Sequence, residues 1–310
     1  MLGVLMSGGG GAEELYSAIE QSARMVGAAC SRDKTWPILT AFGGALTDAM
    51  VVFSVQTGER HAGQLDYCFT VPSEISDPYV HALANGFVAE TDHPVGSLLS
   101  DIQEHCAVSE HFIDCGAAGG FKKVYAHFPR DLQKVSKLAD IPSMPRAVAE
   151  NLGLFARYGL EDVAMIGIDY RSRTTSLYFQ FTAEGRPEPS ALLSMLREIG
   201  LPEPSARMLD FAHKSFRANF TLDWDSPKIQ RVAFAPPLGP GLDLSAVPAH
   251  IESHIERFAT STPRVYDGER MNLFAVKWMP AGEFVEVCSY YQVSAAYEPV
   301  RLMEARKEQA

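Results

Sequence analysis

The sequence predicts an α+β fold in which ten antiparallel strands close into a barrel, with helices outside and a ligand cavity inside. Strand-like segments come in five pairs, each joined by a short turn, and helical segments separate one pair from the next. A doubly wound parallel sheet would instead alternate single strands with helices. Most of these strands have one apolar face and one polar or aromatic face. That pattern suits a closed barrel, which has no exposed edges and is covered by helices on its apolar side.

The elements repeat the order helix, strand, strand, helix. Strand pairs are predicted where aromatic and β-branched runs are broken by turn residues: 50–56 with 64–71, 110–115 with 120–128, 163–170 with 174–182, 216–224 with 228–235, and 269–279 with 283–293. Helices are predicted from apolar residues spaced three and four apart: 12–29, 77–87, 95–106, 131–138, 146–157, 190–200, 205–213, 247–259 and 298–307. We expect one domain over 12–310 that follows a flexible leader, 1–11.

Side chains alternate between the two faces of a strand, so the strands also predict which residues enter the lumen. Tyr67 and Phe69 share an apolar face that helices should cover, whereas Asp66 and Cys68 share the polar face. The same alternation gives one inward set: Phe121, Lys123, Tyr125, His127, Thr174, Ser176, Tyr178, Gln180, Arg217, Asn219, Thr221, Ile229, Arg231, Ala233 and Ala235. A lumen with this mixture is typical of a binding cavity rather than a packed core. Taken alone, 119–128 also fits a half-solvated edge strand with ordinary lysines.

Composition limits the partners. The net charge of −11 argues against a nucleic-acid footprint or an anionic membrane surface. Because this overall field repels anions, an anionic ligand would have to be held by local cations. The five cysteines have no CxxC spacing, which fits free thiols in the cytoplasm. We therefore expect a cytoplasmic monomer that acts on small molecules.

A family resemblance runs from about Leu15 to Glu304. It is carried by collinear stretches: CSRDK at 30–34, VVFS at 51–54, QLDYCFTVP at 64–72, GGFKKVYAHFP at 119–129, IPSMP, AVAEN and LFARYGL within 141–160, LYF at 177–179, KSF at 214–216 and SYY at 289–291. In these stretches the chain resembles the aromatic prenyltransferases of the ABBA fold, and within them the soluble bacterial family that acts on phenols such as dihydroxynaphthalenes. The resemblance implies five α-β-β-α repeats that close a ten-stranded barrel.

The reaction implied by the resemblance moves a prenyl group from an isoprenyl diphosphate to an electron-rich aromatic ring, mainly at carbon. Such a reaction needs cations that stabilise the leaving diphosphate, aromatic rings that shield the allylic cation, and an acceptor stacked within attack distance. Overall similarity favours geranyl over dimethylallyl as the donor group. The alternative is a non-catalytic carrier barrel for a hydrophobic aromatic molecule.

The resemblance also assigns roles to residues. The implied catalytic residues are Lys123, Arg231, Tyr125, Tyr178 and Tyr290. The implied diphosphate contacts are Lys123, Arg231, Thr174, Ser176, Asn219 and Lys277. The implied acceptor and prenyl contacts are Phe53, Cys68, Tyr125, His127, Met165, Tyr178, Gln180, Phe216, Arg217, Ala235, Leu273, Glu286, Cys288 and Tyr290. Asp66 matches the carboxylate that binds Mg²⁺ in magnesium-dependent members, and a structural role or a salt bridge to Arg217 is the alternative.

The chain departs from the family pattern where charge matters. Asn219 replaces a tyrosine that contacts diphosphate, and Glu286 replaces a lysine on the last strand. If Ala281 and Gly282 form a two-residue turn, Lys277 lies directly opposite Glu286, and we expect the two to be joined inside the barrel. Arg217, His127 and Gln180 stand where members carry smaller or less polar groups, which indicates a more polar or acidic acceptor.

Overall fold

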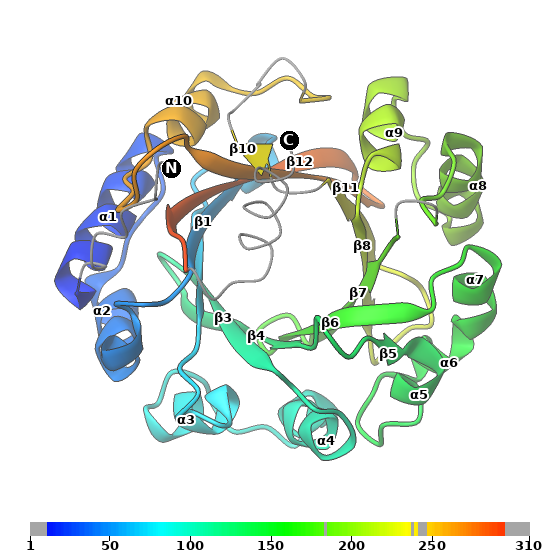
Figure 1. The fold of residues 1–310 in the computed structure, drawn as a ribbon, viewed down its shortest axis with the longest axis horizontal. Helices are drawn as coiled ribbons and strands as arrows, with labels where there is room; N and C mark the ends of the chain where they lie inside the picture. The colour runs from blue at the N-terminus through cyan, green and yellow to red at the C-terminus, as the bar shows by residue number, and fades with distance from the viewer. Residues whose placement is uncertain (1–10, 183–184, 237–238, 241–246, 295–310) are drawn as a thin grey trace, which may run out of the picture.

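Ten strands form a closed antiparallel barrel in the computed structural model, which describes residues 11–182, 185–236, 239–240 and 247–294 (Figure 1). The strands are β1 (Val51–Gln56), β2 (Asp66–Thr70), β3 (Glu110–Gly116), β4 (Gly120–His127), β6 (Asp162–Asp169), β7 (Thr174–Gln180), β8 (Arg217–Asp223), β9 (Arg231–Ala235), β11 (Met271–Met279) and β12 (Gly282–Gln292). Neighbours in the chain pair antiparallel, and β12 with β1 and β9 with β11 complete the ring. The predicted barrel is confirmed.

Two very short strands, β5 (Gln133–Lys134) and β10 (Gly239–Pro240), add to β6 and β11. All five hairpin turns lie at one end of the barrel, because each strand pair runs up and down once and the helical connection to the next pair starts and ends at the opposite end. We call these the hairpin end and the helix end.

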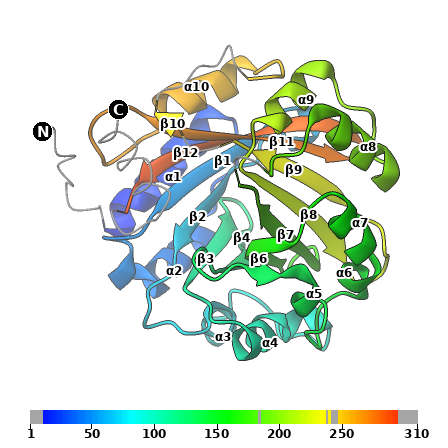
Figure 2. The same cartoon turned by 45° about the vertical axis from the view of Figure 1, so that its right-hand side comes forward.

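Helices form an outer layer that follows chain order around the barrel (Figures 1 and 2). They are α1 (Ala12–Met25), α2 (Arg32–Ala41), α3 (Pro78–Ala84), α4 (Leu98–His105), α5 (Val135–Leu138), α6 (Arg146–Glu150), α7 (Leu152–Arg157), α8 (Pro189–Ile199), α9 (Ala206–His213) and α10 (Ser253–Ser261), with 3₁₀ turns at Gly43–Ala45, Glu59–His61 and Pro94–Gly96. Asp77 accepts hydrogen bonds from the backbone of Tyr79 and Val80, which caps α3. None of the described helices is both long and apolar enough to cross a membrane.

The helix predictions differ from the structure in several places. Helix α2 was not expected, and Pro37 inside it is a residue that normally ends helices. Helix α10 begins at Ser253 rather than at 247, and the segment 146–157 is split into α6 and α7. The predicted helix 298–307 and nearly all of the predicted leader lie outside the described residues.

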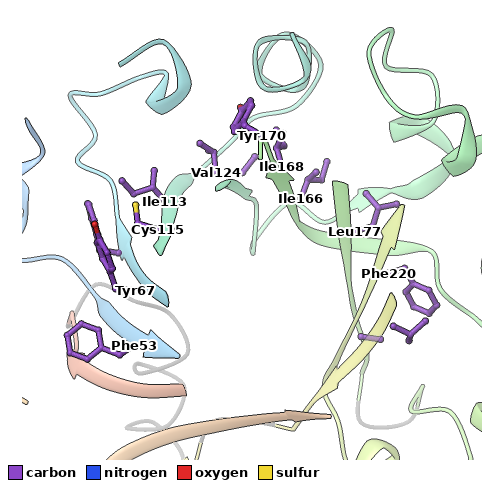
Figure 3. Packing of buried hydrophobic residues seen from close by; sticks show 14 of the residues in the cluster. Phe53, Tyr67, Ile113, Cys115, Val124, Ile166, Ile168, Tyr170, Leu177 and Phe220 are labelled. Carbon is purple, nitrogen blue, oxygen red and sulfur yellow. The ribbon is translucent and has the colours of Figure 1, made fainter. Parts of the chain in front are cut away.

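The main hydrophobic core lies between the outer face of the barrel and the helices. In Figure 3, Tyr67, Val124, Leu177 and Phe220 point away from the barrel interior toward this layer, and all four are buried. Phe53 belongs to the same core, and its ring stacks on Tyr291 with centroids 5.5 Å apart. The expectation that Phe53 lines the cavity is therefore wrong, because the alternation of β1 turns Ser54 and Gln56 inward instead.

A β-bulge changes the predicted phase of β4. Asp114 pairs with Lys123 but Cys115 pairs with Phe121, so Lys122 is an extra residue in the ladder. As a result Lys122 enters the lumen beside Lys123. Phe121 turns outward, where its ring lies 6.1 Å from that of Tyr170. The expectation that Phe121 faces the lumen is therefore wrong, because the extra residue of the bulge turns its side chain to the outer face.

Candidate active site

A cavity of about 230 Å³ lies inside the barrel. Its charged residues occupy the halves of their strands next to the hairpin turns, with the exception of Arg217, which begins β8 at the helix end. The cations in the lining are Lys122, Lys123, Arg217, Arg231 and Lys277, and the acids are Asp66, Asp114, Asp169 and Glu286. The hairpin end is therefore a dense charged site inside a chain that is acidic overall.

Lys123 and Arg231 carry positive charge that faces the cavity. Lys123 is 6% exposed, and burial lowers the pKa of its ammonium while the nearby Asp169 carboxylate opposes this shift. Arg231 donates from Nη2 to Thr221 Oγ1 at 3.3 Å, and that hydroxyl lies 2.9 Å from Ser176 Oγ. Asp169 is held by backbone groups of its own turn, since one of its oxygens accepts from Arg171 N and Ser172 N. The two cations remain available to an anion.

Lys122 joins two carboxylates. Its Nζ lies 2.5 Å from Asp66 Oδ2 and 4.0 Å from Asp114 Oδ2. Burial disfavours the charged form of Lys122, but the two carboxylates outweigh it and raise its pKa. Burial raises the pKa of Asp114 to about 6, with Asp66 adding to the rise and Lys122 opposing it. Asp66 thus forms a salt bridge with Lys122, and the expected partner, Arg217, is wrong.

Lys277 and Glu286 form an ion pair inside the barrel, with Nζ and Oε1 2.7 Å apart. The expected contact between these two side chains is confirmed, although the expected pairing register of their two strands is wrong. Met279 pairs with Gly282, so Lys277 lies opposite Phe284 and Ala275 lies opposite Glu286. The side chains meet diagonally on one face. Burial raises the pKa of Glu286, but Lys277 and Arg231 outweigh it and bring the value to about 2.

Two tyrosines form an aromatic wall beside the charged site. The rings of Tyr125 and Tyr178 meet edge to face with centroids 6.0 Å apart, and Lys123 Nζ lies 5.4 Å from the centroid of Tyr125. Gly167 pairs with Tyr125 and makes room for its ring, because a Cβ there would lie 2.9 Å from Cε1 of that ring. Burial raises the pKa of both phenols, so both rings stay neutral near pH 7.

The helix end of the lumen is mainly apolar. Met50, Phe112, Tyr266, Met271, Tyr290 and Val293 form a second buried cluster, and Val52, Cys68, Tyr125 and Leu273 pack against it. Phe216, Arg217, Met165 and Ala235 also line the cavity. The guanidinium of Arg217 lies 5.0 Å from the centroid of the Phe216 ring.

The structure brings most of the expected site residues together. The lining includes Asp66, Cys68, Lys123, Tyr125, Met165, Tyr178, Phe216, Arg217, Asn219, Arg231, Ala235, Leu273, Lys277, Glu286 and Cys288. It does not include Phe53, His127, Thr174, Ser176, Gln180 or Tyr290. His127 is 2% exposed, with its Nδ1 3.4 Å from Glu110 Oε2, and Tyr290 packs in the second cluster. Ser176 contacts Arg231 only through Thr221.

Several lining residues were not expected from the sequence, chiefly Lys122, Asp114 and Asp169. Alternation along 110–115 would have placed Asp114 with Phe112 on one face, so a signal for it was present. Lys122 carried no such signal, because only the bulge turns it inward. The resulting arrangement can hold a polyphosphate anion at the hairpin end and a flat apolar molecule against Tyr125 and Tyr178.

Comparison with known proteins agrees with this geometry. The profile of a family described as "Aromatic prenyltransferase Orf2" matches residues 11–299. The chain is 43% identical over 294 residues to a 5,10-dihydrophenazine-1-carboxylate 9-dimethylallyltransferase of Streptomyces anulatus, which covers 94% of this chain and 97% of the relative. It is 42% identical over 290 residues to a flaviolin linalyltransferase of Streptomyces virginiae (93% and 95%), and 40% identical over 299 residues to a furaquinocin biosynthesis prenyltransferase of Streptomyces sp. strain KO-3988 (94% and 95%).

Proposed function

The chain belongs to the aromatic prenyltransferases of the Orf2 family, enzymes of secondary metabolism, and we propose that it moves a prenyl group from an isoprenyl diphosphate to a ring carbon of an electron-rich aromatic acceptor. The observation that best supports this proposal is the convergence of Lys123 and Arg231 on one end of a cavity whose next wall is Tyr125 and Tyr178. The cations would hold the diphosphate, and the rings would shield the cation formed when it leaves.

The proposed reaction begins when the carbon–oxygen bond between the prenyl chain and the diphosphate breaks and its electron pair leaves with the diphosphate. Lys123 and Arg231 stabilise the added charge on that oxygen. A ring carbon of the acceptor then attacks the allylic cation between Tyr125 and Tyr178, and the released diphosphate takes the proton from that carbon, which restores the aromatic ring. Closure within the barrel keeps water away from the cation.

Incubation with dimethylallyl or geranyl diphosphate and a panel of naphthols and phenols tests this proposal. We expect a prenylated product by mass spectrometry and one released diphosphate for each product. Binding of an aromatic ligand without either product would instead support the carrier function. The same experiment also compares the dimethylallyl donor with the geranyl donor that sequence similarity suggests.

The residues around Asp66 do not fit a resident Mg²⁺. The Lys122 ammonium already lies against the Asp66 carboxylate and close to Asp114, so a divalent cation at Asp66 would meet a fixed like charge. Among the residues that the structure describes, no group of three or more His, Cys, Asp or Glu side chains could hold a metal. We propose that Lys122 supplies the positive charge at this position.

Activity should therefore be retained in excess EDTA. Lys122→Ala should lower turnover and make the remaining activity respond to Mg²⁺, because the Asp66 carboxylate is then free to bind a hard cation. Steady-state rates with and without Mg²⁺ measure both effects. Lys134→Ala, which removes an exposed lysine paired with Glu161 and Asp162, is the control. Loss of all activity of the unmodified chain in EDTA would contradict the assignment.

A further inference from the structure

Arg217 lies in the same cavity but apart from the charged site at the hairpin end. It is the first residue of β8, whereas Thr221, on the same strand, pairs with Arg231. At about 3.3 Å per residue, this separation is roughly 13 Å along the strand. Asn219, between them, pairs with Tyr178. The order along this wall is therefore Arg217, then the aromatic ring of Tyr178, then Arg231.

Arg217 has no anionic partner in the described part of the chain. It forms no salt bridge there, its Nε is buried without a hydrogen-bond partner, and the contact that holds it is the face of Phe216. Lys122 and Lys277, by contrast, each have a carboxylate within 2.7 Å. Arg231 donates from Nη2 to the hydroxyl of Thr221, although its Nε, like that of Arg217, is buried without a hydrogen-bond partner. A cation that faces a binding cavity and leaves its donors unused is suited to an anion supplied by the ligand.

A diphosphate held by Lys123 and Arg231 lies at the hairpin end of the cavity. Arg217 begins β8 at the helix end, and its backbone lies roughly 13 Å along the strand from the level of Arg231. The aromatic acceptor is the remaining ligand, and it must lie between the two levels if its ring stacks near Tyr178. A substituent on the side of the acceptor away from the donor then reaches Arg217.

We propose that the acceptor carries a carboxylate and that Arg217 binds it. A guanidinium is planar and presents two parallel N–H donors, which match the two oxygens of a carboxylate. The contact would orient the acceptor with its carboxylate at the helix end and a more distant ring carbon toward the prenyl cation. This inference rests on the proposed function, because it assigns the substrate class of the same site.

The test compares a hydroxynaphthoic acid with its carboxamide and with the parent naphthol, each with dimethylallyl diphosphate. The readout is the ratio of kcat/KM for the acid to that for the carboxamide. We expect this ratio to favour the acid in the unmodified chain by roughly ten- to a hundredfold, the size of a hydrogen bond to a charged group. Arg217→Met should abolish the preference, and Arg217→Lys should retain part of it.

Two controls keep the outcomes distinct. Arg197→Met removes an exposed arginine that pairs with Glu203, and it should leave the ratio unchanged. Titration of each variant with the hydroxynaphthoic acid alone measures the Arg217 contact without any reaction. Prenylated product with the same ratio in the unmodified chain and in Arg217→Met would overturn this inference and leave the proposed function standing. Failure to prenylate any acceptor would overturn the function, and acid binding unaffected by Arg217→Met would then overturn the inference as well.

Discussion

Replacing Lys123 or Arg231 with alanine should lower kcat roughly 10²- to 10³-fold, or about 2.7–4 kcal/mol, which is the usual effect of removing one preorganised donor from a developing negative charge. Both side chains line the hairpin end of the cavity. Their charge matters most as the carbon–oxygen bond breaks, because the leaving diphosphate gains charge at that moment. The loss should therefore appear in kcat as well as in kcat/KM, and single-turnover measurements with saturating donor would report it directly.

The two positions allow different controls. Arg231→Lys keeps the charge but loses the fork that reaches Thr221, so it should be less damaging than Arg231→Ala. Lys123→Arg would add bulk beside Tyr125, whose ring centroid lies 5.4 Å from the ammonium. Lys123→Met keeps the volume and removes only the charge, so it should lower kcat as much as Lys123→Ala does. Thermal unfolding of each variant checks the fold. Turnover at the unmodified rate in both alanine variants would rule out this end of the barrel as the diphosphate site.

Alternation along strands was enough to predict the barrel and most of the cavity, because helices outside require an apolar outer face on every strand. Tyr67 and Phe69 went to the core and Asp66 and Cys68 to the lumen, as their alternation indicates. Phe53 shows the opposite case. Its place between Val51 and Val55 already indicated the outer face of the barrel. The resemblance instead assigned Phe53 to the cavity, and the structure follows the periodicity of β1.

The remaining differences come from events that a period of two cannot predict. The bulge at Lys122 adds one residue, which reverses the phase on one side of it and brings a second ammonium to Asp66. The turn between β11 and β12 differs from the expected one by two partner positions, since Lys277 pairs with Phe284 and not with Glu286. A register shift of two residues keeps every side chain on the same face of the sheet, so the ion pair still forms in the observed register.

The Lys277–Glu286 pair should show strong coupling in a double-mutant cycle. Lys277 and Glu286 are 8% and 22% exposed, and breaking a buried pair by removing one partner typically costs about 3–5 kcal/mol of the free energy of unfolding. Lys277→Ala leaves the Glu286 carboxylate beside the proposed diphosphate site, so it should lower stability and raise the donor KM. Glu286→Gln removes a negative charge that repels the donor and frees Lys277, so donor affinity should be unchanged or better.

The double variant separates the pair from its surroundings. Lys277→Ala with Glu286→Gln leaves no buried carboxylate without its ammonium, so it should cost less, in both donor KM and stability, than Lys277→Ala alone. Gln56 Nε2 lies 3.3 Å from Glu286 Oε1 and can still contact the amide of Glu286→Gln, which makes glutamine a better replacement than alanine here. Urea unfolding and donor KM for the four proteins measure the interaction energy. Strictly additive effects on both quantities would show that the two charges act independently and would contradict the coupling.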